Sequence, residues 1–358
     1  MRAAVFVGVE QPLSIENVKP AEPGPGDVIV EIGASGVCHS DLSIMRGYVP
    51  LPPGVILGHE GAGRVVEVGK EVTKVRKGDR VVASFVPACG TCWFCLREQS
   101  NHCEQEPATM MTPRGTRSDG SPYLCMTGLG TFAEAITTSE NSVVRVDGDV
   151  ADEQLALIGC GVTTGVGAAL NTARVQPGST VAVLGCGGVG QAVVQGARIA
   201  GAARIIAVDT VPMKREQARK FGATDEVDPK QGDAVEQVKS LTGGRGVDYA
   251  FEVIGLPETI LQTYNMARNG GTVCIVGMSR MDAQVSFSAF QLFYEEKKIL
   301  GSKYGSAQVR RDFQRFIDLI ESGRLDTGHM VSRTIKLDQV NDAFRAMEAG
   351  EVIRSVIV

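Results

Sequence analysis

Four of the nine cysteines lie close together, in the pattern Cys89-x2-Cys92-x2-Cys95-x7-Cys103. A tetrahedral zinc ion takes four thiolates, and a C-x2-C turn supplies neighbouring ligands. An odd number of cysteines in a long chain without a secretory signal argues against a disulfide framework. Reduced, buried cysteines are the alternative, but they rarely occur at this density. Because four thiolates leave no open coordination position, the pattern predicts a structural zinc site.

A glycine-rich segment at residues 185–190 reads Gly-Cys-Gly-Gly-Val-Gly and fits the G-x-G-x-x-G pattern. An apolar run at 181–184 precedes it and a helical segment at 191–200 follows it. Such a strand, turn and helix bind the pyrophosphate of a dinucleotide at the helix N-terminus. The residues predicted to form this phosphate site are Gly185, Gly187, Gly188, Val189 and Gly190.

Asp209 ends the next apolar run, 19 residues beyond Gly190. A carboxylate at this position accepts hydrogen bonds from the ribose hydroxyls and repels a 2′-phosphate, so NAD is favoured over NADP. A strand-to-helix turn without a ligand is the alternative, and it leaves the acid after the second strand unexplained.

Two further segments carry metal-ligand types. Cys38 is followed by His39, Ser40 and Asp41, and His59 is followed by Glu60. A lone cysteine or histidine is more often a core residue or a satisfied polar group than a ligand. Spacing alone therefore leaves both readings open here.

The elements that must position these residues fall into two regions. Residues 1–150 are β-rich, with short β-branched runs at 28–32, 64–68 and 79–83 between Gly and Pro turns. From about residue 180, strands at 181–184, 205–208, 248–254 and 272–276 alternate with helices such as 191–200 and 214–221. This alternation predicts a doubly wound parallel sheet, an α/β fold. A length of 358 residues suits two domains.

Composition excludes several functional classes. Lys+Arg 36 against Asp+Glu 41 gives a net charge of −5 with no basic stripe, which argues against a nucleic-acid binder. No stretch approaches ~18 uninterrupted apolar residues, so no membrane span is expected. The first residues indicate a β-strand and not a signal peptide, so we expect a cytoplasmic protein.

Taken in order, the motifs resemble those of one family. Cys38-His39-Ser40-Asp41, Gly58-His59-Glu60-Gly61, the four-cysteine spacing, Gly159-Cys160-Gly161 and the glycine-rich turn at 185–190 occur together. The whole chain resembles a zinc-dependent alcohol dehydrogenase of the medium-chain dehydrogenase/reductase family. This resemblance implies a GroES-like, zinc-binding catalytic domain at 1–161 and 304–358, and an NAD-binding Rossmann domain at 162–303.

The resemblance also implies a second, catalytic zinc ion with Cys38, His59 and Cys160 as its protein ligands. Two thiolates, one imidazole and an open position suit a Lewis-acid zinc. Asp41 and Glu60 would support the ligands, with Asp41 orienting the His59 ring. Ser40 would hydrogen-bond the substrate oxygen and begin a proton relay.

The remaining carried-over roles concern the cofactor and the substrate pocket. His39 and Arg354 resemble the family's pyrophosphate-contacting cations, and Lys214 would lie near the adenosine ribose. Thr164, Val189 and Val276 would pack around the nicotinamide. Phe85 resembles a wall residue of the substrate pocket.

The expected activity is the interconversion of a primary or aromatic alcohol and its aldehyde or ketone by hydride transfer to NAD. Ser43 stands where many relatives end the relay with a histidine. Pro107 stands where glutathione-dependent relatives carry an arginine, and residues 46–55 contain no carboxylate, so a thiol-adduct substrate is disfavoured.

Two other readings stay open: a polyol dehydrogenase or double-bond reductase on the same scaffold, and a non-catalytic module that binds NAD and zinc. The partners expected are a small alcohol or aldehyde and further copies of the chain, as a homodimer or homotetramer. The strand at 273–276 and the segment 279–290 resemble the subunit contact of relatives.

Overall fold

The computed structural model describes residues 1–358, which form two compact units. Unit 1 comprises residues 1–161, 308–323 and 327–358, and unit 2 comprises 162–307 and 324–326. The chain first leaves unit 1 after residue 161 and returns to it after residue 307, and residues 324–326 pack with unit 2.

Unit 1 is β-rich, as expected, and contains a small closed barrel and a larger sheet. The barrel strands, in order around it, are β1 (Arg2–Phe6), β2 (Ser14–Pro20), β7 (Gly115–Arg117), β8 (Pro122–Cys125) and β4 (Val55–Ile56). The sheet has the order β10 (Val143–Arg145), β6 (Arg80–Ala83), β5 (Glu60–Val68), β3 (Asp27–Gly36), β18 (Arg354–Ile357) and β17 (Val331–Ile335), with β9 (Ala135–Ser139) also paired to β3.

The helices of unit 1 are short except for two near the C-terminus. They are α1 (His39–Met45), α2 (Glu106–Met111), α3 (Asp152–Leu157), α10 (Val309–Glu321) and α11 (Val340–Glu348). In α10 the apolar residues recur at helical spacing and the chain turns at Gly323, whose φ is +69°, as the sequence indicates.

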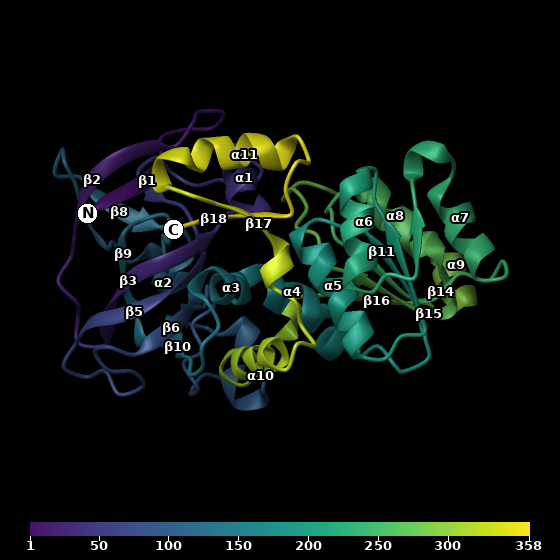
Figure 1. Ribbon diagram of the computed structural model, residues 1–358, viewed down its shortest axis with the longest axis horizontal. Helices are drawn as coiled ribbons and strands as arrows, with labels where there is room; N and C mark the ends of the chain where they lie inside the picture. The colour runs from purple at the N-terminus through teal and green to yellow at the C-terminus, as the bar shows by residue number, and fades with distance from the viewer. The chain divides into compact units, whose positions relative to one another are not determined.

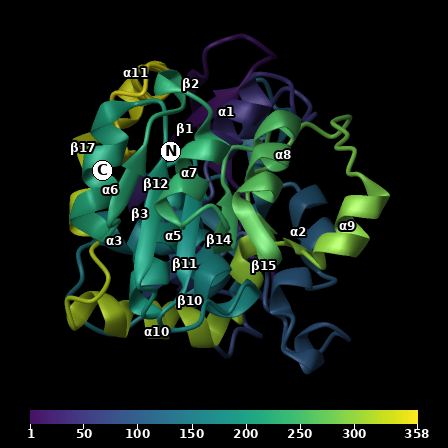
Figure 2. The same ribbon diagram turned by 90° about the vertical axis from the view of Figure 1, so that its right-hand side faces the viewer.

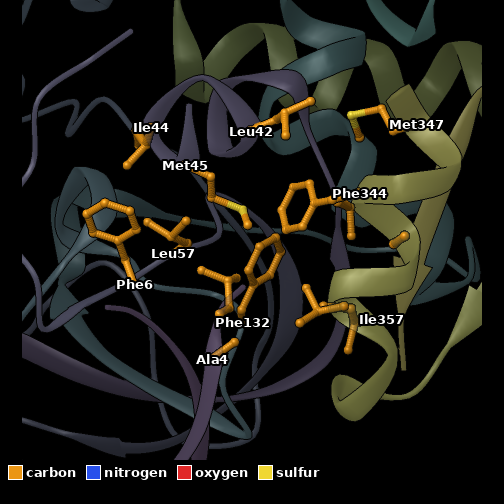
Figure 3. Packing of buried hydrophobic residues seen from close by; sticks show 14 of the residues in the cluster. Ala4, Phe6, Leu42, Ile44, Met45, Leu57, Phe132, Phe344, Met347 and Ile357 are labelled. Atoms are coloured by element: carbon orange, nitrogen blue, oxygen red, sulfur yellow. The ribbon is translucent and has the colours of Figure 1, made fainter. Parts of the chain in front are cut away.

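A hydrophobic cluster fixes α1 between the barrel and α11 (Figure 3). Leu42, Ile44 and Met45 of α1 point into this cluster, where the rings of Phe132 and Phe344 lie 6.3 Å apart in an edge-to-face arrangement. Because the buried face of α1 is held in this way, the residues on its first turn occupy fixed positions.

Unit 2 is built on a six-stranded sheet in which every neighbouring pair is parallel. Its order is β13 (Asp225–Val227), β12 (Arg204–Val208), β11 (Thr180–Leu184), β14 (Val247–Glu252), β15 (Ala267–Ile275) and β16 (Lys298–Gly301). Figure 2 shows four of these strands, β12, β11, β14 and β15, side by side. The order reverses direction at β11, which is the switch point of a doubly wound dinucleotide-binding sheet.

Helices cover both faces of this sheet, and its central strands β11 and β12 are apolar after their first residues, Thr180 and Arg204. The helices are α4 (Thr163–Gly167), α5 (Gly188–Ile199), α6 (Pro212–Phe221), α7 (Ala234–Leu241), α8 (Pro257–Met266) and α9 (Ala289–Glu295). Helix α5 packs against α6, and α7 packs against α8 (Figure 1). The predicted α/β fold with a β-rich first region is confirmed.

One continuous helical segment, residues 152–172, is long and apolar enough to cross a membrane by length and composition, with a mean hydropathy of 1.4 over its most apolar window. However, 78% of that window is buried inside the protein, as is usual for a core helix. Its apolar character therefore reflects burial in the fold.

Candidate active site

Three ligand types from distant parts of unit 1 converge at one point. The ligand atoms of Cys38, His59, Glu60 and Cys160 all lie within 4.8 Å of one another, and all four residues are buried. Strands β3 and β5 pair with Gly36 opposite Glu60, which brings together the loop after β3 and the residue before β5. A Cβ atom on Gly36 would collide with the Glu60 carboxylate, so this close approach requires glycine.

Cys160 reaches the site from a π-helical turn, Ile158–Val162, inserted between α3 and α4. Such a turn adds a residue to the helix and redirects side chains, and it occurs often at functional sites. Gly159 lets this turn approach the sheet, because a Cβ atom there would lie 2.9 Å from the carbonyl oxygen of Ala83. Cys160 lies 101 positions beyond His59, so no local pattern in the sequence signals that the two residues meet.

Asp41 fixes the orientation of the His59 ring. Its Oδ1 lies 3.3 Å from Nδ1 of His59 and accepts the Gly58 N–H at 3.0 Å, while Oδ2 accepts the Cys38 N–H at 3.1 Å. With Nδ1–H donated to Asp41, the lone pair on Nε2 is directed toward the thiols. Nε2 is buried and has no hydrogen-bond partner within the protein, as expected of a metal ligand.

The charges at this cluster favour a bound cation. The hydrogen bond from Cys160, together with Arg354 and His59, outweighs burial and lowers the pKa of Cys38 well below its ordinary value. The same contact and burial raise the pKa of Cys160. Burial lowers the pKa of His59, but Asp41 outweighs it and the net shift is upward. A divalent ion held by both sulfur atoms would allow both thiols to ionise.

Glu60 pairs with Arg354 in the same buried site. Oε1 of Glu60 lies 3.2 Å from Nη2 of Arg354 and accepts the Gly161 N–H at 3.1 Å. Arg354 also donates to the Val37 carbonyl at 3.1 Å. Burial raises the pKa of Glu60 to about 7, although Arg354 opposes that shift.

Arg354, which the resemblance assigns to the cofactor pyrophosphate, is buried beside Glu60. Its side chain is only 3% exposed, and Cys38, Glu60 and Cys160 contribute to its electrostatic surroundings. No local pattern in the sequence indicates this pairing with Glu60, because the two residues are far apart in the chain. The contact between Arg354 and pyrophosphate stays a prediction.

Three other predicted residues lie near this cluster. The hydroxyl of Ser40, half-buried on the first turn of α1, is 3.9 Å from the Cys38 sulfur. The ring of Phe85 meets the His59 ring edge-on, with centroids 5.9 Å apart. His39, the first residue of α1, is exposed. Ser40 and Phe85 are thus adjacent to the candidate metal ligands Cys38 and His59, as their predicted roles in proton transfer and substrate contact require.

The four clustered cysteines form a second convergent set. Their sulfur atoms all lie within 4.8 Å, with Cys89 3.8 Å from Cys95 and Cys92 4.0 Å from Cys103. Zn–S bonds of about 2.3 Å give a tetrahedral edge of about 3.8 Å, so the spacing fits zinc. Backbone N–H groups of Thr91 and Cys92 point at the Cys89 sulfur at 3.4 and 3.3 Å.

The pKa values of these four thiols shift in opposite directions when no cation is present. Burial opposes ionisation of Cys89, but donors from Thr91 and Cys92 outweigh it and lower the pKa to about 6. Burial raises the pKa of Cys95 to about 12. The residues present therefore fit a closed zinc site with no open position.

In unit 2 the glycine-rich turn has the geometry of a phosphate site. Gly185 has φ +96°, and a Cβ atom on Gly190 would collide with the Gly185 carbonyl. A Cβ atom on Gly187 would meet nothing within 4 Å, so the turn presents open backbone there. Helix α5 begins at Gly188 without a side-chain cap, which leaves its first N–H groups available to an anion.

Asp209 is held beside this turn at the end of β12. Its Oδ2 accepts the Cys186 N–H and its Oδ1 accepts the Val211 N–H, each at 2.8 Å. The carboxylate is half-buried, so an oxygen lone pair remains open to a ribose.

The other predicted cofactor residues in this unit, Thr164, Val189, Lys214 and Val276, are also half-buried, and their contacts to a nucleotide stay predictions. Sequence reasoning missed a buried carboxylate at the same edge of the sheet. Oε1 of Glu252 accepts N–H groups from Ile254 and Gly255, at 2.9 and 2.8 Å, and the Thr259 hydroxyl at 2.7 Å. It fixes the loop after β14, and a Cβ atom on Gly185 would lie 2.6 Å from Ile254. A single Glu after an apolar run is not a pattern that predicts this role for Glu252.

Comparison with known proteins identifies the family. The family model described as the alcohol dehydrogenase GroES-like domain matches residues 24–148, and that of the zinc-binding dehydrogenase matches residues 188–322. An S-(hydroxymethyl)glutathione dehydrogenase from Synechocystis sp. is 41% identical over 99% of each chain. The chain belongs to the zinc-dependent alcohol dehydrogenases of the medium-chain dehydrogenase/reductase family.

Solved structures of related dehydrogenases share the complete fold. Benzyl alcohol dehydrogenase from Acinetobacter calcoaceticus has a TM-score of 0.92 and 30% identity, covering 99% of this chain and 98% of its own. A zinc-binding dehydrogenase from Sinorhizobium meliloti 1021, solved with NADP bound, has a TM-score of 0.83 and 30% identity, covering 100% and 98%. Zinc and a nicotinamide dinucleotide are therefore the cofactors of this alcohol dehydrogenase.

Proposed function

We propose that this enzyme interconverts primary or aromatic alcohols and their carbonyl products by hydride transfer to and from NAD. The observation that carries the proposal is the convergence of Cys38, His59 and Cys160 with an unpartnered, buried His59 Nε2. The fourth member of the cluster, Glu60, is held by Arg354 and Gly161. Three ligands thus leave a coordination position for a substrate oxygen, unlike the closed four-cysteine site.

Cys38, His59 and Cys160 would hold the catalytic zinc. When bound, that ion supplies Lewis-acid polarisation of the substrate oxygen and lowers the pKa of its proton. Asp41 keeps the His59 ring in the tautomer that presents Nε2. The Ser40 hydroxyl accepts the alcohol proton and passes it outward, because Ser40 is only half-buried at the start of α1. Ser43 offers no base, so the proton passes to water.

The cofactor form is inferred from Asp209. Its carboxylate is anchored by two backbone N–H groups, so it does not swing away from an approaching 2′-phosphate. A fixed negative charge at the ribose disfavours NADP by electrostatic repulsion and offers NAD a hydrogen-bond acceptor.

The substrate class is inferred from residues 46–55, where the resemblance places the acidic contact of glutathione-dependent relatives. This segment has no carboxylate, and its one arginine, Arg46, is engaged by Glu10 and Glu348. Charged groups that could recognise a peptide-like thiol are therefore absent or occupied there. Tyr48 is 46% exposed and contributes an aromatic surface instead. This segment therefore suits a plain alcohol with an apolar substituent better than a charged thiol adduct.

S-(hydroxymethyl)glutathione is the second candidate substrate, and it is favoured by relatives at 39–41% identity that are S-(hydroxymethyl)glutathione dehydrogenases. The test uses purified enzyme with its zinc content measured, and follows NADH formation with benzyl alcohol, ethanol, a polyol and S-(hydroxymethyl)glutathione. The highest kcat/KM with benzyl alcohol or ethanol supports the proposal. A preference for the glutathione adduct replaces it with the second candidate, and absence of all turnover supports a non-catalytic binding module.

The role of Ser40 is tested by Ser40→Ala beside a control, Ser322→Ala, on the exposed end of α10. Proton transfer by a positioned group contributes about 10²-fold or more to rate, so kcat falls strongly in S40A while its zinc content stays unchanged. Wild-type turnover in S40A removes the serine from the relay.

We also infer a cytoplasmic homo-oligomer. Phe290, Phe293 and Tyr294 on α9 are 69%, 77% and 69% exposed, and they adjoin the segment that resembles a subunit contact. Large aromatic side chains on one surface are typical of an association site. Light scattering on the purified enzyme measures its mass; a monomer at micromolar concentration contradicts the inference.

A further inference from the structure

Unit 2 contains a cavity at the opposite edge of the sheet from the dinucleotide turn. Its lining includes Thr180, Arg204, Asp248 and Arg268, which stand at or next to the first residues of β11, β12, β14 and β15. The dinucleotide turn follows the carboxyl end of β11, whereas these residues gather at the amino ends of the parallel strands. The cavity volume is about 360 Å³, within the range of small-molecule sites.

Three guanidinium groups line this cavity, and carboxylates neutralise only two of them. Nε of Arg204 pairs with Asp225 at 3.2 Å, and Nε of Arg268 pairs with Asp248 at 2.7 Å. Both carboxylates carry further donors: Asp225 accepts from the Thr224 hydroxyl, and Asp248 accepts the N–H and hydroxyl of Thr180 at 2.7 and 2.8 Å. The third guanidinium, that of Arg245, therefore leaves an excess positive charge.

Arg245 is exposed, and its side chain makes no hydrogen bond or ion pair within the protein. Its Nη1 lies over Gly243, 3.6 Å from where a Cβ atom would stand. The turn after α7 holds it there, because Gly243, Gly244 and Gly246 have φ values of +62°, +80° and +95°. These positive φ values fix a tight path that directs the arginine to the cavity.

The backbone N–H groups of Arg245 and Gly246 already have acceptors within the protein. A ligand in the cavity would therefore be bound by the guanidinium groups. The Arg245 N–H bonds to the Thr242 carbonyl at 3.4 Å, and the Gly246 N–H bonds to the Thr242 hydroxyl at 3.1 Å. Arg204 and Arg268 use Nε and Nη1 in their existing contacts with the protein, which leaves an Nη2 group on each. Several guanidinium groups that line one cavity can donate hydrogen bonds to the oxygens of a tetrahedral anion.

We propose that this cavity binds a phosphate group, as inorganic phosphate or as the head of a small phosphate monoester. A phosphate accepts several hydrogen bonds and offsets the unpaired charge of Arg245. A bound phosphate would link the amino ends of β12 and β15 to the turn after α7, and so stabilise unit 2. The site is independent of the proposed substrate and lies apart from the dinucleotide turn.

The experiment is calorimetric titration of the zinc-loaded enzyme in a phosphate-free buffer at constant ionic strength. NAD is present at saturation, so that the dinucleotide site is filled. The probes are inorganic phosphate and glycerol 3-phosphate. The test variant is Arg245→Gln, and the matched control is Arg219→Gln, which removes the same charge from an arginine 51% exposed on α6 and paired with Glu226.

The expected result is saturable binding with one site per chain in the wild type and in R219Q. Loss of a charge-assisted contact in R245Q weakens that binding by about tenfold or more. Binding of inorganic phosphate alone assigns the site to the free ion, and tighter binding of glycerol 3-phosphate assigns it to a monoester. Absence of saturable binding in the wild type overturns the proposal, as does equal binding by R245Q and R219Q.

Discussion

Replacing Asp41 by asparagine provides a sharp test of the catalytic metal site. Asp41 is fully buried, and its carboxylate accepts from three donors: Nδ1–H of His59 and the N–H groups of Gly58 and Cys38. An asparagine of the same shape has only one acceptor oxygen. Its NH2 group must therefore face at least one of these donors.

The expected loss of stability in D41N depends on how the three donors are divided between the two carboxylate oxygens of Asp41. Asparagine does least harm with its oxygen toward Gly58 and His59, because only the Cys38 N–H then loses its acceptor. One unsatisfied buried donor costs about 1–3 kcal/mol in stability. The His59 ring also loses its charged partner, and changes to such supporting carboxylates lower metal affinity by about 10–100-fold.

The assay is zinc analysis of wild type, D41N and an exposed control, Asp147→Asn, during titration with a chelator. Asp147 is 74% exposed and pairs only with Arg145 on the surface. We expect D41N to release one zinc ion at about 10–100-fold lower chelator concentration, while the four-cysteine zinc is released as in wild type. Equal release of both ions in D41N and D147N would refute the role assigned to Asp41.

Three further outcomes are expected. Cys95→Ser removes one of four converging thiolates, so zinc content falls from two ions to one and the thermal midpoint decreases; retention of both ions contradicts a four-thiolate site. Asp209→Ser removes the charge at the ribose, so kcat/KM falls with NAD and rises with NADP; an unchanged ratio contradicts its role. Burial opposes ionisation of Asp248, but donors from Thr180 and Arg268 outweigh it and lower its pKa. The ionised Asp248 carboxylate therefore stabilises the folded state above the unfolded pKa of about 3.9, and this stabilisation is lost as the pH falls through the folded pKa. In D248N, the free energy of unfolding measured in urea should fall less steeply than in wild type as the pH is lowered.

Residues close together in the chain allowed prediction of two parts of this enzyme. The four-cysteine site depends on a short segment in which backbone N–H groups and sulfur atoms are neighbours, so its spacing is visible in the sequence. The dinucleotide turn is equally local: Gly185, Gly187 and Gly190 serve one strand, one turn and one helix. The alternation of strands and helices then predicted the parallel sheet of unit 2, and the structure confirmed it.

Resemblance to a family supplied what spacing did not. Cys38 and His59 alone were ambiguous, and Cys160 lies 101 positions beyond His59, so only the family pattern joined them. The pattern assigned Arg354 to pyrophosphate but gave no sign that it is buried beside Glu60, because a single arginine in a β-strand looks like a surface charge.

The sequence by itself determined the features that depend on residues close together in the chain, namely the four-thiolate segment, the phosphate turn and the acid at Asp209. The tertiary structure alone decided which distant groups share one environment: Cys160 with Cys38 and His59, Glu60 with Arg354, and Arg204 with Arg245 and Arg268. The physical reason is that strand register, a π-helical turn and sheet order set these distances. Each depends on packing between segments far apart in the chain, which no local pattern of residues encodes.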